Sequence, residues 1–452
     1  MFIVPLLVLL LSEPDVQSLL DRAAVLPPEL HADIILRLIE AGQIKESAKE
    51  KELLEEAFRL SQQARSPAPL QLGAGVTAPA ASTAGMLIAA SDLKLDRLSL
   101  SQRILDRMLA VDPHLARDRF LTVNFPHPPA PGCQDAVGPR YEPYFRLLFA
   151  VVENGFSDED KRAGKALAYT SEQLRSLTSP EQITAAAAAL SDAPLTGPER
   201  GDLANALLSS LGRVNTTWRS FGLLPATVQA LNTLANRLVA SGESPDAIGR
   251  ALHGYISRHI ARPRCAESAS GPDPVAEGVS GFNQFYTGKL KLEGLPAFAA
   301  SPSRPPPVEG AATAYEFFSA ADSQQIMSRY QRLRGQQPRS AEWEPSLRAF
   351  LTDLQRWRPK APETPASWFH ERMILARDLL ALIPPGPLRD EHWETSARFL
   401  ADSPMLAESP AEWLLEAADL IKEPEAATYV PRMGDPRLAL LFEAGQLLGP
   451  HK

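Results

Sequence analysis

The segments Ser340-Ala-Glu-Trp343, Thr364-Pro-Ala-Ser-Trp368, Asp390-Glu-His-Trp393 and Ser409-Pro-Ala-Glu-Trp413 decide how this chain folds. Each begins with a side chain that can accept a hydrogen bond from the free N–H groups of a first helical turn. The second and fourth place proline at the first helical position, where a missing N–H costs nothing. The tryptophans recur at intervals of 25, 25 and 20 residues. This pattern predicts one helix per interval, with its tryptophan near the start.

The four tryptophans allow two interpretations. Apolar residues follow each of them at the spacing of one helix face, so each ring can pack the first turn of its helix against the preceding helix. Alternatively, Trp343, Trp368, Trp393 and Trp413 line a concave surface that binds a peptide or a sugar. The sequence favours packing, yet these four residues are the first place to look for a partner surface.

The rest of the chain follows the same pattern of caps and apolar stripes. Starts such as Ser179-Pro-Glu and Ser244-Pro-Asp precede apolar residues at helical spacing, and Pro/Gly turns separate the segments. No run with the period of two that is typical of a strand exceeds about five residues. We therefore predict an all-α fold of serial antiparallel helices in two parts, as an α-solenoid or an irregular helical bundle. The 34-residue tetratricopeptide period is not present in the sequence.

A stretch rich in Pro, Gly and Ser divides the chain. Residues 263–312 break the helical pattern, apart from an apolar insert, and they contain Ser301-Pro-Ser-Arg-Pro-Pro-Pro, which is typical of a stiff, extended linker. We predict an N-terminal helical region at 13–262, a linker at 263–312 and a C-terminal helical region at 313–452. The N-terminal region contains only Trp218, so the tryptophan marker belongs to the C-terminal region.

The N-terminus bears on where the protein functions. Met1–Leu11 reads MFIVPLLVLLL, which has the length of the apolar core of a secretory signal but is too short to span a bilayer stably. No Lys or Arg precedes this run and no A-x-A site follows it. Residues 1–12 are therefore a signal segment, the apolar end of a first helix, or a membrane anchor. We expect an exported protein, periplasmic or extracellular, with a cytoplasmic location as the alternative.

The two cysteines raise the same question. Cys133 and Cys265 both lie in loop-like sequence that contains proline. Free cysteines are usually buried within helices or strands, so this placement suggests a disulfide. Such a bond would close a loop of about 130 residues, which is worth on the order of 4–5 kcal/mol in the chain-entropy model. Two unrelated structural cysteines are the alternative, and the long separation excludes a CxxC redox or zinc motif.

Composition argues against a nucleic-acid binder. The net charge is −8 and the isoelectric point is near 5.6, whereas nucleic-acid binders usually show a basic face or domain. Arginines cluster only at 250–264 and 329–339, near predicted helix ends, where cations are favoured. An anion site or an acidic partner is the alternative interpretation of those clusters. The abundance of Ala and Arg is typical of a GC-rich bacterial genome.

The sequence contains no recognisable catalytic, metal or cofactor motif. Its eight histidines are scattered, and HExxH, GxSxG and phosphate-loop patterns are missing. We therefore predict no catalytic residue and no cofactor. The leading hypothesis is an exported, bacterial, helical-repeat binding or scaffold protein whose partner is another protein, with any small-molecule ligand unknown. The main alternative is an all-α hydrolase or lyase with a site in a central groove, and a structural envelope protein is a third.

Overall fold

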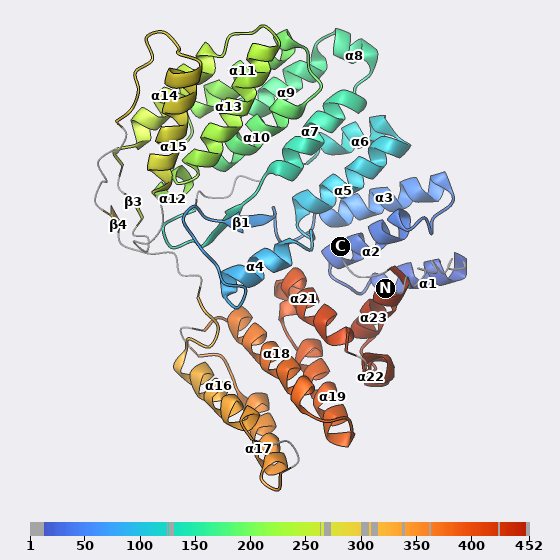
Figure 1. The fold of residues 1–452 in the computed structure, drawn as a ribbon. Helices are drawn as coiled ribbons and strands as arrows, with labels where there is room; N and C mark the ends of the chain where they lie inside the picture. Colours follow the sequence, from blue (N-terminus) through green and yellow to red (C-terminus); the bar gives the residue numbers. More distant parts are fainter. Residues whose placement is uncertain are drawn as a thin grey trace, which may run out of the picture. The chain divides into compact units, whose positions relative to one another are not determined.

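The computed structural model describes residues 13–123, 125, 131–262, 264–265, 273–299, 307–308, 315–336, 340–360, 363–423 and 425–448. The suspected signal segment 1–12 and parts of the 263–312 linker lie outside these ranges. Within them the predicted all-α fold is confirmed, with only short strand pairings beside the helices (Figure 1). None of the described helices has both the length and the apolar character that a membrane span requires. The choice between solenoid and bundle stays a prediction.

The helices and strands, in chain order, are α1 (Glu13–Ala23), α2 (Pro28–Glu40), α3 (Ser47–Ser61), β1 (Leu70–Leu72), α4 (Thr83–Ser91), α5 (Arg97–Val111), α6 (Pro113–Phe120), β2 (Val137–Pro139), α7 (Glu142–Asn154), α8 (Asp158–Arg162), α9 (Lys165–Arg175), α10 (Pro180–Asp192), α11 (Gly197–Leu211), α12 (Trp218–Phe221), α13 (Leu224–Ala240), α14 (Asp246–His259), β3 (Arg264–Cys265), α15 (Pro274–Phe282), the π-helix η1 (Asn283–Lys289), β4 (Pro307–Val308), α16 (Ala321–Arg334), α17 (Trp343–Arg356), α18 (Pro365–Leu382), α19 (Pro387–Ala401), α20 (Met405–Glu408), α21 (Pro410–Ile421), α22 (Ala426–Met433) and α23 (Pro436–Leu448).

Contacts group these elements into two compact units. Unit 1 comprises residues 1–65, 79–95 and 315–452, and unit 2 comprises residues 66–78 and 96–314. This grouping differs from the sequential division into 13–262 and 313–452, because α1 and α2 pack against α23 and α4 packs against α21. An amphipathic stripe reveals that a helix has a buried face, but it does not reveal which helix covers that face. The last change of unit, at residues 314–315, falls close to the predicted end of the linker at 312.

The tryptophan-marked helices all belong to unit 1. Thr364 caps α18 as predicted, since its side chain accepts a hydrogen bond from the N–H of Ser367. Trp343, Trp368 and Trp413 lie in the first turns of α17, α18 and α21. The predicted start of α19 at Asp390 is wrong, because the helix begins at Pro387. Gly386 precedes it with a φ of 147°, a conformation that favours glycine and sets the sharp turn into the helix.

Unit 2 is a set of helices that pack closely through small residues. Ala186 and Ala187 of α10 are fully buried, and α10 packs against α13, α11 and α7. A Cβ at Gly278 of α15 would lie 2.5 Å from Leu224 Cγ at the start of α13, so only glycine allows this approach. Strands β1 and β2 pair in antiparallel fashion, with Leu70 opposite Pro139, while β3 and β4 pair in parallel. These short pairings hold the loops around α12 rather than building a sheet core.

Candidate functional site

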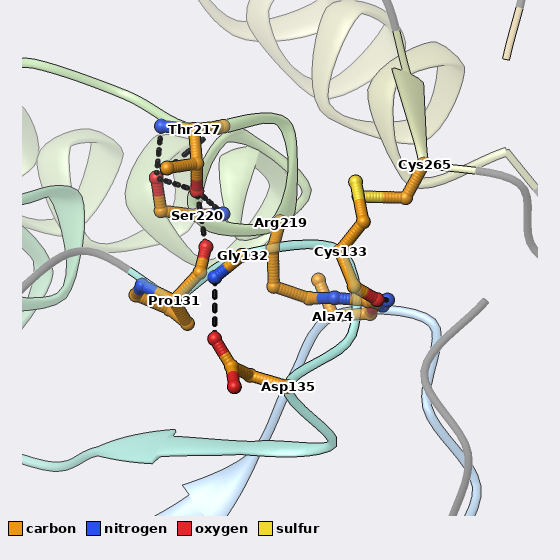
Figure 2. The surroundings of a disulfide bond; sticks show 9 residues. All are labelled: Ala74, Pro131, Gly132, Cys133, Asp135, Thr217, Arg219, Ser220 and Cys265. Carbon is orange, nitrogen blue, oxygen red and sulfur yellow. Dashed lines mark hydrogen bonds between the residues drawn. A yellow bond between two sulfur atoms is a disulfide. The ribbon is translucent and has the colours of Figure 1, made fainter. Parts of the chain in front are cut away.

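The two cysteines that the sequence singled out are joined in unit 2. Cys133 Sγ and Cys265 Sγ are 1.97 Å apart, and their Cα atoms are 5.2 Å apart (Figure 2). Cys133 lies in the loop that leads to β2, and Cys265 is the last residue of β3. Cys265 is buried and Cys133 is half-buried. The bond therefore connects two loop segments that are 132 residues apart in the sequence.

A buried arginine holds the same loop from a second direction. Arg219 of α12 donates from Nη1 to the Ala74 carbonyl at 2.8 Å and from Nη2 to the Cys133 carbonyl at 2.7 Å. Its side chain is 1% exposed and passes so close to Gly73 that a Cβ there would lie 2.9 Å from Arg219 Cδ. Figure 2 shows the guanidinium reaching both carbonyls beside the disulfide. Arg219 was missed at the sequence level, because nothing local distinguishes it from an exposed arginine.

Further hydrogen bonds fix the chain on either side of Cys133. Thr217 Oγ1 donates to the Pro131 carbonyl, and the N–H of Gly132 donates to Asp135 Oδ2 at 2.6 Å (Figure 2). Thr217 also accepts from the N–H of Ser220 in the short helix α12. Three adjacent residues of the loop thus have their backbone groups bonded. This arrangement is a structural cross-link, and it presents no free thiol for catalysis.

The four tryptophans occupy different environments within unit 1. Trp343, Trp393 and Trp413 are 4%, 0% and 0% exposed, whereas Trp368 is half-buried. The indole N–H of Trp413 donates to the Leu400 carbonyl at 2.9 Å. Trp393 packs on Tyr429, with ring centroids 5.5 Å apart. Three of the four rings are therefore buried in the core of unit 1, as the packing interpretation expects, and Trp368 is partly exposed.

A buried ion cluster that the sequence did not indicate lies between α18 and α21. His370 is fully buried, with Nε2 2.7 Å from Glu412 Oε2 and Nδ1 2.9 Å from Glu416 Oε1. A carboxylate oxygen only accepts, so both ring nitrogens must carry a proton for both bonds to form. His370 is therefore an imidazolium in this arrangement. Its two partners lie four residues apart on one face of α21, which is a spacing that could have been noticed, but nothing in the sequence pairs that face with His370.

Neighbouring charges balance the cluster. Arg377 Nη1 lies 2.8 Å from Glu416 Oε2 and 2.7 Å from Asp419 Oδ2. Ser409 Oγ donates to Glu412 Oε1 at 2.6 Å. Burial by itself lowers the pKa of His370, but the hydrogen bonds and charges of Glu412 and Glu416 outweigh burial and raise that pKa to about 9. The cluster is an internal ionic link between two helices, and its burial leaves no room for a substrate at the imidazole.

The carboxyl of Glu371 faces the other side of α18. It is fully buried, and its Oε1 accepts the N–H of Phe318 at 2.7 Å. Burial raises the pKa of Glu371 to about 7, with a smaller contribution in the same direction from the nearby Glu363, while the hydrogen bond from the Phe318 N–H lowers it and offsets only part of the rise. Phe318 has a φ of 61°, which is unusual for a bulky residue, so this bond stabilises a strained turn.

An open groove runs between α7 and α10 in unit 2. Its volume is about 400 Å³, and Phe149 and several alanines supply the apolar part of its lining. Its charged lining residues are Glu142, Arg146, Glu153 and Asp192. No histidine, cysteine, serine, threonine or tyrosine lines it. The groove therefore offers apolar contact and negative charge, and its lining has carboxylates but no hydroxyl, thiol or imidazole.

A second recess of about 410 Å³ lies in unit 1, where α1 meets the residues that precede α3. Its wall includes Val16 and Leu20 of α1. Among the residues with described positions, no three or more His, Cys, Asp or Glu side chains are arranged to hold a metal ion.

A comparison of the chain with protein-family models, with curated proteins and with solved structures found no match. Any function must therefore be argued from the two loops joined by the disulfide, the buried charges and the groove.

Proposed function

We propose that this protein is an exported binding or scaffold protein of a bacterial type, without catalytic activity. The observation that carries the proposal is the α7–α10 groove, since its lining of Phe149, alanines and carboxylates suits contact with another protein. The polar groups of the groove lining are carboxylates and Arg146, with no hydroxyl, thiol or imidazole among them.

The disulfide supports the exported location. Disulfides persist in oxidising compartments such as the periplasm and are rare in the cytosol. The Cys133–Cys265 bond joins two loops that Arg219 also holds, so oxidation fits the local structure without rearrangement. In the cytosol the same two thiols would be held reduced.

The compartment is tested by counting thiols in the protein purified without reductant and then denatured. No reactive thiol is expected when the chain comes from the envelope or the medium of the cells that make it. Two reactive thiols, together with recovery of the uncleaved chain from the cytoplasm, would overturn export.

The binding function is tested in the same cells with an affinity-tagged full chain, chemical cross-linking before lysis, and mass spectrometry of the purified product. A stoichiometric complex with one defined protein is expected. If the chain is recovered only as itself, at every cross-linker concentration that links a known envelope complex, the binding function is wrong.

A further inference from the structure

The α7–α10 groove has an asymmetric charge pattern. Glu153 lies in the last turn of α7, and Asp192 is the last residue of α10. Helix C-termini already carry partial negative charge, so a carboxylate at such an end is unfavourable by itself. Both carboxylates line the groove and both are exposed. Their position gives one part of the groove a concentrated negative potential.

Neighbouring cations neutralise this potential only in part, and one of them, Arg146 of α7, itself lines the groove. Lys161 Nζ donates to the backbone carbonyl of Glu153 and not to its carboxylate. Arg237 Nη2 lies 3.9 Å from Asp192 Oδ1, and both of these side chains are largely exposed. Exposed pairs of this kind contribute little free energy. A cationic partner would therefore gain attraction from both carboxylates.

The opposite wall explains how closely a partner can approach. On α10, Ala185 is buried while Ala188 is exposed and Ala189 is half-buried. These side chains end at Cβ, so they leave a trough beside Phe149 of α7. Glu142 lies at the other end of α7 and also lines the groove, 11 residues before Glu153. At about 1.5 Å per residue this separation is about 16 Å, or three helical turns.

We propose that the α7–α10 groove binds a basic amphipathic α-helix of a partner protein. The apolar face of that helix packs on Phe149 and the alanines, and its Lys or Arg side chains face Glu153 and Asp192. The inference rests on the proposed binding function and adds the chemistry of the partner. Electrostatic complementarity of this kind directs specificity and association rate more than total affinity.

The test uses the full-length oxidised protein and two labelled helical peptides of 18 residues. The peptides share one Leu/Ala face and carry either Lys or Glu at all flanking positions. Fluorescence anisotropy is expected to show saturable binding of the Lys peptide, at least about ten-fold tighter than that of the Glu peptide, and weakening as salt is added.

Matched variants locate the site. Ala188→Trp fills the trough, and Ala110→Trp places the same ring on an exposed position of α5 as its control. Glu153→Gln with Asp192→Asn removes the negative charge, and Asp202→Asn on α11 is its control. The two groove variants are expected to weaken Lys-peptide binding at least about ten-fold, and the two controls are expected to leave it unchanged.

Three results would overturn the inference: no saturable binding of the Lys peptide, equal binding of the two peptides, or equal effects of Ala188→Trp and Ala110→Trp. Circular dichroism of each variant separates lost binding from lost folding. If the peptides fail while the cross-linked complex forms in cells, the groove is wrong and the binding function stands. If the complex also fails to form, both are wrong.

Discussion

Each unit contains a link between segments that are distant in the sequence, but the chemistry of the two links differs. In unit 2 a disulfide and Arg219 connect a loop, β3 and α12 through a covalent bond and backbone carbonyls. In unit 1 an imidazolium and two carboxylates connect α18 and α21. The first link responds to reductant, and the second responds to pH. Because the responses differ, each link can be tested while the other serves as its control.

Tryptophan fluorescence makes this comparison practical. Five of the six tryptophans lie in residues 315–452 and belong to unit 1, and only Trp218 belongs to unit 2. Fluorescence therefore reports mainly on unit 1. Hydrogen–deuterium exchange of peptides from α10 and α13 reports on unit 2, since buried helix interiors exchange only through opening.

The largest expected effect comes from removing the disulfide. Replacing both Cys133 and Cys265 by serine should destabilise unit 2 by about 4–5 kcal/mol, because the unfolded chain regains the freedom of a loop of 132 residues. Exchange in α10 and α13 should accelerate, and the urea midpoint followed by tryptophan fluorescence should stay within error of the parent. An equal loss of stability by hydrogen exchange and by tryptophan fluorescence would show that the two units unfold together. The two links could then not be tested separately.

The second effect comes from breaking the ion cluster. Glu416→Leu leaves His370 and Arg377 without a fully buried partner carboxylate, so unit 1 should lose about 3–5 kcal/mol in urea unfolding followed by fluorescence. Glu408→Leu, at an exposed position of α20, is the control and should change stability by less than about 0.5 kcal/mol. If Glu416→Leu instead accelerated hydrogen exchange in unit 2 alone, the assignment of the cluster's stabilisation to unit 1 would be wrong.

The third effect is a pH dependence restricted to unit 1. The pKa of His370 is about 9 in the folded protein against an ordinary value of 6.5, so its stabilisation is full below pH 6.5 and is lost as the pH rises towards 9. The loss should approach about 3 kcal/mol. Glu371, with a pKa of about 7, acts in the same direction but between pH 4.5 and 7.

Urea unfolding from pH 6.5 to 9.5 measures this loss, and His370→Gln is the matched variant. Its stability should be lower at pH 6.5 and should change little above that pH, because the titrating group is gone. A parent-like slope in this variant would assign the pH dependence to other groups. NMR of the parent at pH 7 should show protons on both ring nitrogens of His370.

The smallest expected effect concerns the tryptophans. Trp413→Phe keeps an aromatic ring but leaves the Leu400 carbonyl without its indole donor, which should cost about 1–3 kcal/mol. Trp368→Phe should cost less, because Trp368 is half-buried and its indole N–H meets no acceptor among the residues that the structure describes. Urea unfolding of both variants checks the order, and a larger loss for Trp368→Phe would contradict the burial difference.

Periodicity and capping predicted the local structure well. Thr364 caps α18 as expected. Asp390 does not begin α19, because the helix begins about one turn earlier, at Pro387. In the sequence, the acid at position 390 looked like a helix start and hid the one at Pro387. Of the candidate sites, the cysteine pair was suggested by its loop context. Arg219 and the His370 cluster had no such signal, since a basic or acidic residue on a helix looks the same in sequence whether it is exposed or paired inside.

The sequence by itself determined that this chain is helical and where most helices begin, because those properties depend on neighbours within a few residues. Only the tertiary structure decided that α1 and α2 pack with α23, that three tryptophans are buried, and that His370 meets two carboxylates of α21. Those features depend on contacts between residues that are tens to hundreds of positions apart, and helical periodicity carries no information about such partners.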